Sequence, residues 1–174
     1  MKKISLGLFV LLLITISVNA QDISEKLAKV PKALQEKVGQ EEPGWIHSSI
    51  TPIEGSKNVI IEQWESSGVA IRVRVTEYDA QRDAVLALKE FKSQLKTQED
   101  AAAARGKADF HLVREDLSEL GDGGFTWDIR GSEAVAFRKQ NFLVFVNIAR
   151  PEGYNDVRLS KEFARRVVEA LSEP

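Results

Sequence analysis

The chain contains no cysteine among its 174 residues. It therefore has no disulfide, no thiol nucleophile, and no cysteine on which a bacterial lipoprotein would be lipidated. Histidine is nearly as scarce, with His47 and His111 far apart in the sequence. Two histidines without a His-Glu-x-x-His spacing do not form a recognisable zinc site. We expect packing alone to stabilise the protein, and we predict no cofactor.

Other standard catalytic and binding patterns are also missing. The chain has no Gly-x-Ser-x-Gly elbow for a serine nucleophile. The glycine-rich segment at residues 121–124 lacks the Gly-Lys-Ser/Thr ending of a phosphate-binding loop, so we interpret it as a turn. The 24 basic and 26 acidic residues nearly balance and form no dense basic tract, which argues against a nucleic-acid partner.

The longest apolar run lies at the amino terminus. Two lysines precede the apolar residues 4–18, and small residues follow before position 21. This pattern is typical of a secretory signal that is cleaved between Ala20 and Gln21, and the run is short for a membrane anchor, which needs about 20 apolar residues. We therefore expect residues 1–20 to be a signal peptide. Residues 21–174 should form one exported domain without a membrane span, periplasmic or extracellular and not a lipoprotein.

Alternation of apolar and polar residues predicts most of the strands. Residues 69–77 alternate valine or isoleucine with arginine and threonine, as in a strand with one packed face and one solvated face. Residues 69–77 are expected to form a hairpin with residues 58–65 through a turn at Gly68. Residues 142–146 are apolar throughout, which predicts a central strand covered on both faces. The expected strands are residues 45–53, 58–65, 69–77, 110–114, 125–129, 134–139 and 142–149.

Apolar residues at helical spacing predict the helices. The first begins at Asp22 and ends at Gly39, and Pro31 should kink it or start a second short helix. A long helix begins after Asp79 and either frays early or continues through the alanines at 101–104. The last helix is capped by Asn155 or Asp156, and its apolar stripe is Leu159, Phe163, Val167 and Leu171.

These elements predict an α+β fold. We expect an antiparallel sheet of about five to seven strands, with the two main helices on one face and a short N-terminal helix. The alternative is three layers, with the N-terminal helical segment on the second face. Residues 59–95 and 134–171 each run through a hairpin, an acidic cap and an amphipathic helix. This similarity indicates either a duplication or the common order of elements in α+β domains.

The last fifty residues resemble segments of uncharacterised bacterial exported α+β domains. The residues that carry the resemblance are Leu120-Gly121-Asp122, the strand at 134–139, the turn at Gln140-Asn141, the apolar residues 143–146 and the closing helix. The resemblance implies an α+β fold and transfers no catalytic residue.

One surface is predicted to bind a ligand. Arg72 and Arg74 share the polar face of their strand, and Arg138 lies in the second hairpin. If these faces coincide, the sheet presents basic groups around Trp64 and Trp127. Guanidinium and aromatic groups hold anionic or sugar-like ligands in this way. The alternative interpretation is an ordinary solvated sheet face with both tryptophans in the core.

Acidic residues near the glycine turn are the calcium candidates, because calcium takes about six to eight oxygen ligands. Their spacing matches no EF-hand or repeat loop, and a solvated acidic turn explains them equally well, so we predict no metal site. These residues are Glu115, Asp116, Glu119 and Asp122.

The leading functional hypothesis is a non-enzymatic exported module that binds a protein or a small anionic ligand. One alternative is a hydrolase that uses scattered acids or the two histidines, His47 and His111. A second alternative is an envelope assembly or scaffold factor. Such a factor would dock its partner on the apolar strand at residue 142 or on the N-terminal helical segment.

Overall fold

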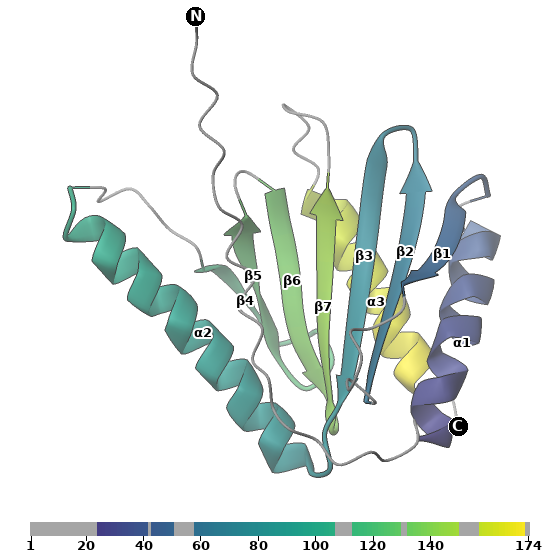
Figure 1. Ribbon diagram of the computed structural model, residues 1–174, viewed down its shortest axis with the longest axis horizontal. Coiled ribbons are helices and arrows are strands. Elements are labelled where there is room, and N and C mark those ends of the chain that lie inside the picture. Colours follow the sequence, from purple (N-terminus) through teal and green to yellow (C-terminus); the bar gives the residue numbers. More distant parts are fainter. Residues whose placement is uncertain are drawn as a thin grey trace, which may run out of the picture.

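An antiparallel sheet separates two layers of helices (Figure 1). The computed structural model describes residues 24–41, 43–50, 58–106, 113–129, 132–149 and 157–172. The strands are β1 (Ile46–Ile50), β2 (Val59–Ser66), β3 (Val69–Glu77), β4 (Val113–Leu117), β5 (Gly124–Ile129), β6 (Ser132–Lys139) and β7 (Phe142–Ala149). The helices are α1 (Glu25–Glu41), α2 (Gln81–Ala103) and α3 (Val157–Ser172).

The strands form a seven-stranded sheet in the order β1-β2-β3-β7-β6-β5-β4, with every pair antiparallel. The predicted α+β class and the antiparallel sheet are therefore confirmed. Two runs of sequential strands meet where β3 pairs with β7. The central position predicted for residues 142–146 is also confirmed, because Leu143 and Val144 are buried from opposite faces of β7.

Helices cover both faces of the sheet, which corrects the expectation that the two main helices share one face. Helices α1 and α3 pack on one face, and α2 packs on the other (Figure 1). The reason is visible in β6, where Ala134 and Ala136 face α2 while Val135 and Phe137 face α3. Because both sides of β6 are apolar, each side needs a helix. The three-layer alternative is correct in the number of layers, but α2 and not α1 forms the third layer.

The two hairpin–helix units are not related by a simple rotation. The hairpins β2–β3 and β6–β7 meet through the antiparallel pair β3–β7, as they would around a two-fold axis perpendicular to the sheet. That axis would place α2 and α3 on the same face. They lie on opposite faces, so the repeat does not extend to the helices.

The start and end of α1 differ from the expectation. Ser24 caps the helix, because its Oγ accepts a backbone N–H at 3.0 Å, while Asp22 lies outside the described residues. Pro31 lies inside one helix and does not start a second one. The helix passes through Gly39, and the left-handed backbone that ends such segments occurs later, at Gly44 with φ 106°.

The other helix ends were predicted in part. Helix α2 continues through the alanines to Ala103, as the longer alternative predicted. Its N-cap is Ala80 without a side-chain hydrogen bond, so Asp79 does not cap it. The expected caps of the last helix, Asn155 and Asp156, lie outside the described residues.

The strand turns follow from local backbone preferences. The predicted hairpin is present, and Ser67 (φ 49°) and Gly68 (φ 81°) form its two-residue turn with positive φ at both positions. Such a turn matches the right-handed twist of the strands. Of the strand expected at residues 110–114, only residues 113 and 114 lie within the described ranges, and both belong to β4.

Candidate functional site

Within the described residues, half of one sheet face is left without a helix. Helix α2 packs on the part of this face formed by β4, β5, β6 and β7. No helix in the described ranges lies over the part formed by β1, β2 and β3 (Figure 1). We call this uncovered part the open face. Strand register places these side chains on the α2 side of the sheet: Ile46, Ser48, Ile50, Ile61, Gln63, Glu65, Arg72 and Arg74.

An aromatic cluster holds α2 away from the open face. The ring of Phe91 on α2 meets Trp127 edge-on at 5.1 Å and Phe145 at 5.0 Å between centroids. Edge-to-face contacts of this kind stabilise a pair beyond simple burial. Ala134 and Ala136 lie between them, and their small side chains let the helix approach β6 closely. The helix therefore sits over one half of the sheet.

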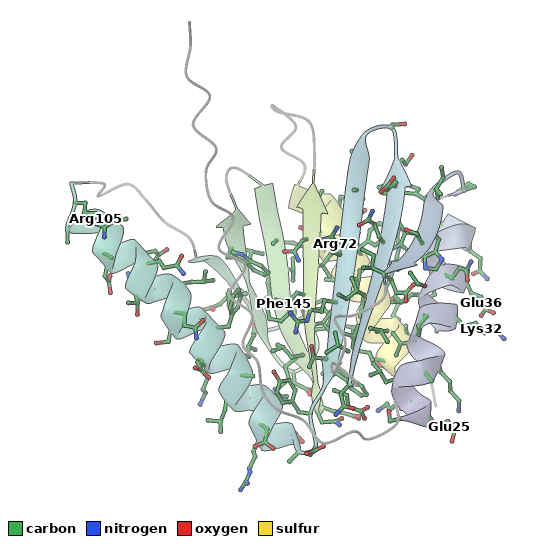
Figure 2. All side chains as sticks on the ribbon, viewed as in Figure 1. Glu25, Lys32, Glu36, Arg72, Arg105 and Phe145 are labelled. Carbon is green, nitrogen blue, oxygen red and sulfur yellow. The ribbon has the colours of Figure 1, made fainter. Side chains whose placement is uncertain are left out.

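The two arginines on β3 lie at the border between the covered and open halves. Both are exposed, and Arg72 lies opposite Asn147 and Arg74 opposite Phe145 of β7; Figure 2 labels Arg72 and Phe145 on these central strands. Nε and Nη2 of Arg72 donate hydrogen bonds to Oε1 of Gln63 at 3.2 and 3.0 Å, which orients the guanidinium along the sheet. The hydrogen bonds to Gln63 occupy some of the N–H groups of Arg72. The remaining N–H groups of its guanidinium can donate to an anion.

Arg74 lies closer to the start of α2. Burial raises the pKa of the Tyr78 hydroxyl above its usual value; the positive charge of Arg74 opposes this shift, and Glu90 on α2 adds to it. The tyrosine is itself anchored, since its backbone N–H donates to the carbonyl oxygen of Asn141 at 2.9 Å. Arg74 thus lies on the open face and also acts electrostatically on Tyr78, just before the start of α2.

Arg138 does not belong to the open face. Its Nη1 donates to Oδ2 of Asp122 at 3.1 Å and to the carbonyl oxygen of Gln140 at 3.0 Å. Its Nη2 donates to the carbonyl oxygen of Asp122 at 3.2 Å. The side chain is 12% exposed. Arg138 therefore ties the glycine turn to the β6–β7 turn.

The two tryptophans are core residues on opposite faces. Trp64 is 1% exposed and packs on the α1 and α3 side, against Phe163. Trp127 is 5% exposed and packs under α2. The alternative interpretation of both tryptophans as core residues describes their positions correctly. The third tryptophan, Trp45, also packs on the α1 and α3 side, with its ring 5.6 Å from that of Phe163. The open face therefore has no tryptophan on which a sugar ring could stack.

Sequence reasoning missed a polar cluster around a buried carboxylate on the other side of β1 and β2. Oε2 of Glu62 lies 2.5 Å from Nε2 of His47 and accepts a hydrogen bond from Oγ of Ser49 at 2.8 Å. The ring of His47 also lies 5.1 Å from that of Trp64. The alternation of residues along β2 could have revealed Glu62, because it occupies an inward position between Ile60 and Trp64. An acidic side chain at such a position needs polar partners.

This cluster is not arranged as a hydrolase triad. In a triad the imidazole lies between the hydroxyl and the acid, so that it can take the hydroxyl proton. Here Glu62 lies between His47 and Ser49, and both hydrogen-bond to the same carboxylate oxygen. The group satisfies a buried carboxylate. The second histidine of the hydrolase hypothesis, His111, lies outside the described residues.

Two of the four calcium candidates pair with basic side chains. Asp116 contacts Nζ of Lys92 on α2, and Asp122 pairs with Arg138. Glu119 is exposed, and the side chain of Glu115 lies outside the described part. Among the described side chains, no group of three or more acidic or histidine residues could hold a metal ion.

The described residues form a three-layer α+β fold in which α2 covers only half of its face of the sheet. None of the helices in the described ranges is long and apolar enough to cross a membrane. No protein-family model matches the chain, and neither the curated proteins nor the solved structures contain a match.

Proposed function

We propose that this protein is an exported, non-enzymatic binding module whose open face holds an acidic, partly apolar segment of a partner protein. The observation that carries the proposal is the pair of exposed arginines, Arg72 and Arg74, on the part of the sheet that α2 leaves uncovered. Guanidinium groups recognise carboxylates through paired N–H donors.

The spacing of the arginines favours an extended ligand. They occupy alternate positions on β3, so their Cα atoms are about 7 Å apart at the usual rise of a strand. Carboxylates at alternate positions of an extended peptide have the same spacing. A peptide that lies along β3 can therefore place an acidic side chain against each arginine.

The rest of the open face favours a polypeptide over a sugar. Ile46 is 72% exposed, and Ile50 and Ile61 lie on the same side of the neighbouring strands. Burial of aliphatic side chains contributes roughly 25 cal/mol per Å² of apolar area. A sugar-like ligand would need an exposed aromatic ring, and Trp64 and Trp127 are both buried.

Peptide selection tests this proposal. Purified protein is used to select peptides from a displayed random library, and we expect enrichment of peptides with Asp or Glu at alternate positions. The double variant Arg72→Glu with Arg74→Glu should lose at least about tenfold in affinity for a selected peptide, since like charges then oppose each other.

Arg105→Glu is the matched control, because Arg105 is exposed at the far end of α2 (Figure 2). It makes the same type of charge change away from the open face and should leave affinity unchanged. Circular dichroism verifies that all variants are folded. Equal affinity of the double variant and the unchanged protein would contradict the proposal, and the open face would then be an ordinary solvated surface.

Export is proposed from residues 1–20 and has a separate test. Cell fractionation followed by mass measurement should find a protein that begins at Gln21 in the periplasm or the medium. A chain that keeps residues 1–20 and stays in the cytoplasm would contradict export without affecting the binding proposal.

A further inference from the structure

The two edges of the sheet differ in how they are protected. At the β4 edge the pairing with β5 shifts between Val113 and Glu115, and Lys92 from α2 reaches Asp116 on this strand. Bulges and charged side chains of this kind prevent another strand from adding to an edge. β1 pairs with β2 in unbroken register over residues 46–50, which contain no proline and no charged lysine or acid. Within the described residues, β1 is therefore the less protected of the two edges.

The sequence of β1 is nearly symmetric about its centre. It reads Ile46-His47-Ser48-Ser49-Ile50, with isoleucine at both ends. We propose that β1 pairs antiparallel with β1 of a second copy of this chain, centred on Ser48. This register places Ile46 opposite Ile50 of the second copy, and the two-fold symmetry repeats the same contact at the other end of the strand pair. The pairing covers Ile46, which is the most exposed large apolar side chain in the described part of the chain at 72%.

The inward side chains of β1 are compatible with this pairing. His47 lies opposite Ser49 of the second copy, and both already hydrogen-bond to Glu62 of their own chain. The central pair is Ser48 with Ser48 of the second copy, which can share a hydrogen bond. No like charges oppose each other along the two strands, a condition that a strand pair requires.

Helix α1 does not oppose this pairing. The two-fold axis between the two Ser48 residues is perpendicular to the sheet and makes α1 antiparallel to α1 of the second copy, on the same face. The outward charges of α1 are already paired within the helix, Glu25 with Lys29 and Lys32 with Glu36, and Figure 2 shows Lys32 and Glu36 projecting away from the sheet. This outward row carries no net charge, so it adds no like-charge repulsion between the copies. The other charged side chains of α1 contact the β6–β7 turn or α3 of their own chain: Lys26, Lys37 and Glu41.

This inference does not rest on the proposed function, because it concerns the edge of the sheet and not the arginines. It does enlarge the open face. The axis keeps the open faces of both copies on the same side, so that the pair presents one continuous surface with Arg72 and Arg74 on each flank.

A single cysteine provides the direct test, since the chain has none. Directly opposed residues of an antiparallel pair have Cβ atoms about 4.5–5.5 Å apart, close to the distance that a disulfide spans. We expect Ser48→Cys to become a disulfide-linked dimer under mild oxidation. Ser93→Cys is the matched control, an exposed serine on α2 that should remain unlinked. Equal crosslinking of the two variants, or none at Ser48→Cys, would overturn the proposal.

A charge swap gives an independent readout. Light scattering of the unchanged protein should show the mass of two chains. Ser48→Lys and Ser48→Glu, each alone, should weaken dimerisation about tenfold through like charges on the axis, and an equimolar mixture of the two should restore the dimer. An unchanged protein that stays monomeric at the highest concentration measured would overturn the proposal, as would a monomer that pairs β1 with another protein's strand. Dimers insensitive to both substitutions would also overturn it.

Discussion

Nε2 of His47 lies 2.5 Å from Oε2 of Glu62, and this contact ties the edge strand β1 to β2 through a carboxylate that is only 3% exposed. A buried carboxylate costs several kcal/mol unless its partners offset the loss of water. His47 and Ser49 are those partners. The cluster therefore stabilises the packing of β1 on β2. β1 contributes side chains to the open face and forms one edge of the sheet, so both depend on this contact.

Removal of His47 should destabilise the protein. His47→Ala leaves Glu62 buried with one fewer partner, and we expect a loss of roughly 2–3 kcal/mol in the free energy of unfolding. In a Glu62→Met background the same substitution should cost much less, because no buried charge is left unpaired. Urea unfolding of the four proteins in a double-mutant cycle measures this coupling. Equal effects in the two backgrounds would contradict the assigned role of the contact.

Thr126 offers a stabilising substitution. It is fully buried beside Val135, and its Oγ1 has no hydrogen-bond partner in the described structure. Thr126→Val keeps the shape and removes an unsatisfied hydroxyl, so we expect a gain of about 1 kcal/mol. Thr97→Val is the control, since Thr97 is exposed and its hydroxyl donates to Ser93. Calorimetry should show a higher Tm for the Thr126 variant alone; a lower Tm would indicate that the hydroxyl is satisfied.

Tyr78 should make stability fall at alkaline pH. Burial raises the pKa of Tyr78 above its usual 10.0, so the native state retains the proton longer than the unfolded chain. The stabilisation is complete below pH 10 and is lost as the pH rises through the native pKa. Urea unfolding between pH 8 and the alkaline limit should therefore show a steeper decline for the unchanged protein than for Tyr78→Phe. Parallel pH profiles would contradict the raised pKa.

Arg138 and Arg72 should respond differently to truncation. Arg138→Ala breaks the hydrogen bonds to Asp122 and Gln140 and should cost about 1–2 kcal/mol of stability. Arg72→Ala, on the exposed face, should change stability by less than about 0.5 kcal/mol and should weaken binding of a selected acidic peptide. Chemical denaturation and a binding titration on the same two variants separate the roles. The reverse pattern would assign Arg138 to binding.

Much of the fold was predictable because local patterns carry it. The turn at Ser67 and Gly68 and the apolar run at residues 142–146 each point to one backbone arrangement. The placement of α2 was not predictable, since an apolar stripe shows which side of a helix is buried and not which face of a sheet it covers. Ala134 and Ala136 give no sign in the sequence of which face they belong to, although α2 packs against them.

The candidate site was predicted in part. Alternation along β3 placed Arg72 and Arg74 on one face, and the structure agrees. Trp64 and Trp127 were harder to place, because a strand residue can face either layer of a three-layer fold and each faces a different core. The inward position of Glu62 is visible in the alternation of β2, but its partners lie on another strand, and pairing between strands is not visible in a single sequence.

The central claim is that the open face is the binding surface, and isoleucine methyl NMR tests it most directly. A selected acidic peptide is titrated at constant protein concentration. We predict that the methyl signal of Ile61 shifts, with those of Ile46 and Ile50, while Ile60 and Ile71, buried on the opposite face, stay in place. Shifts confined to Ile60 and Ile71, or an unmoved Ile61 at saturation, would contradict the account.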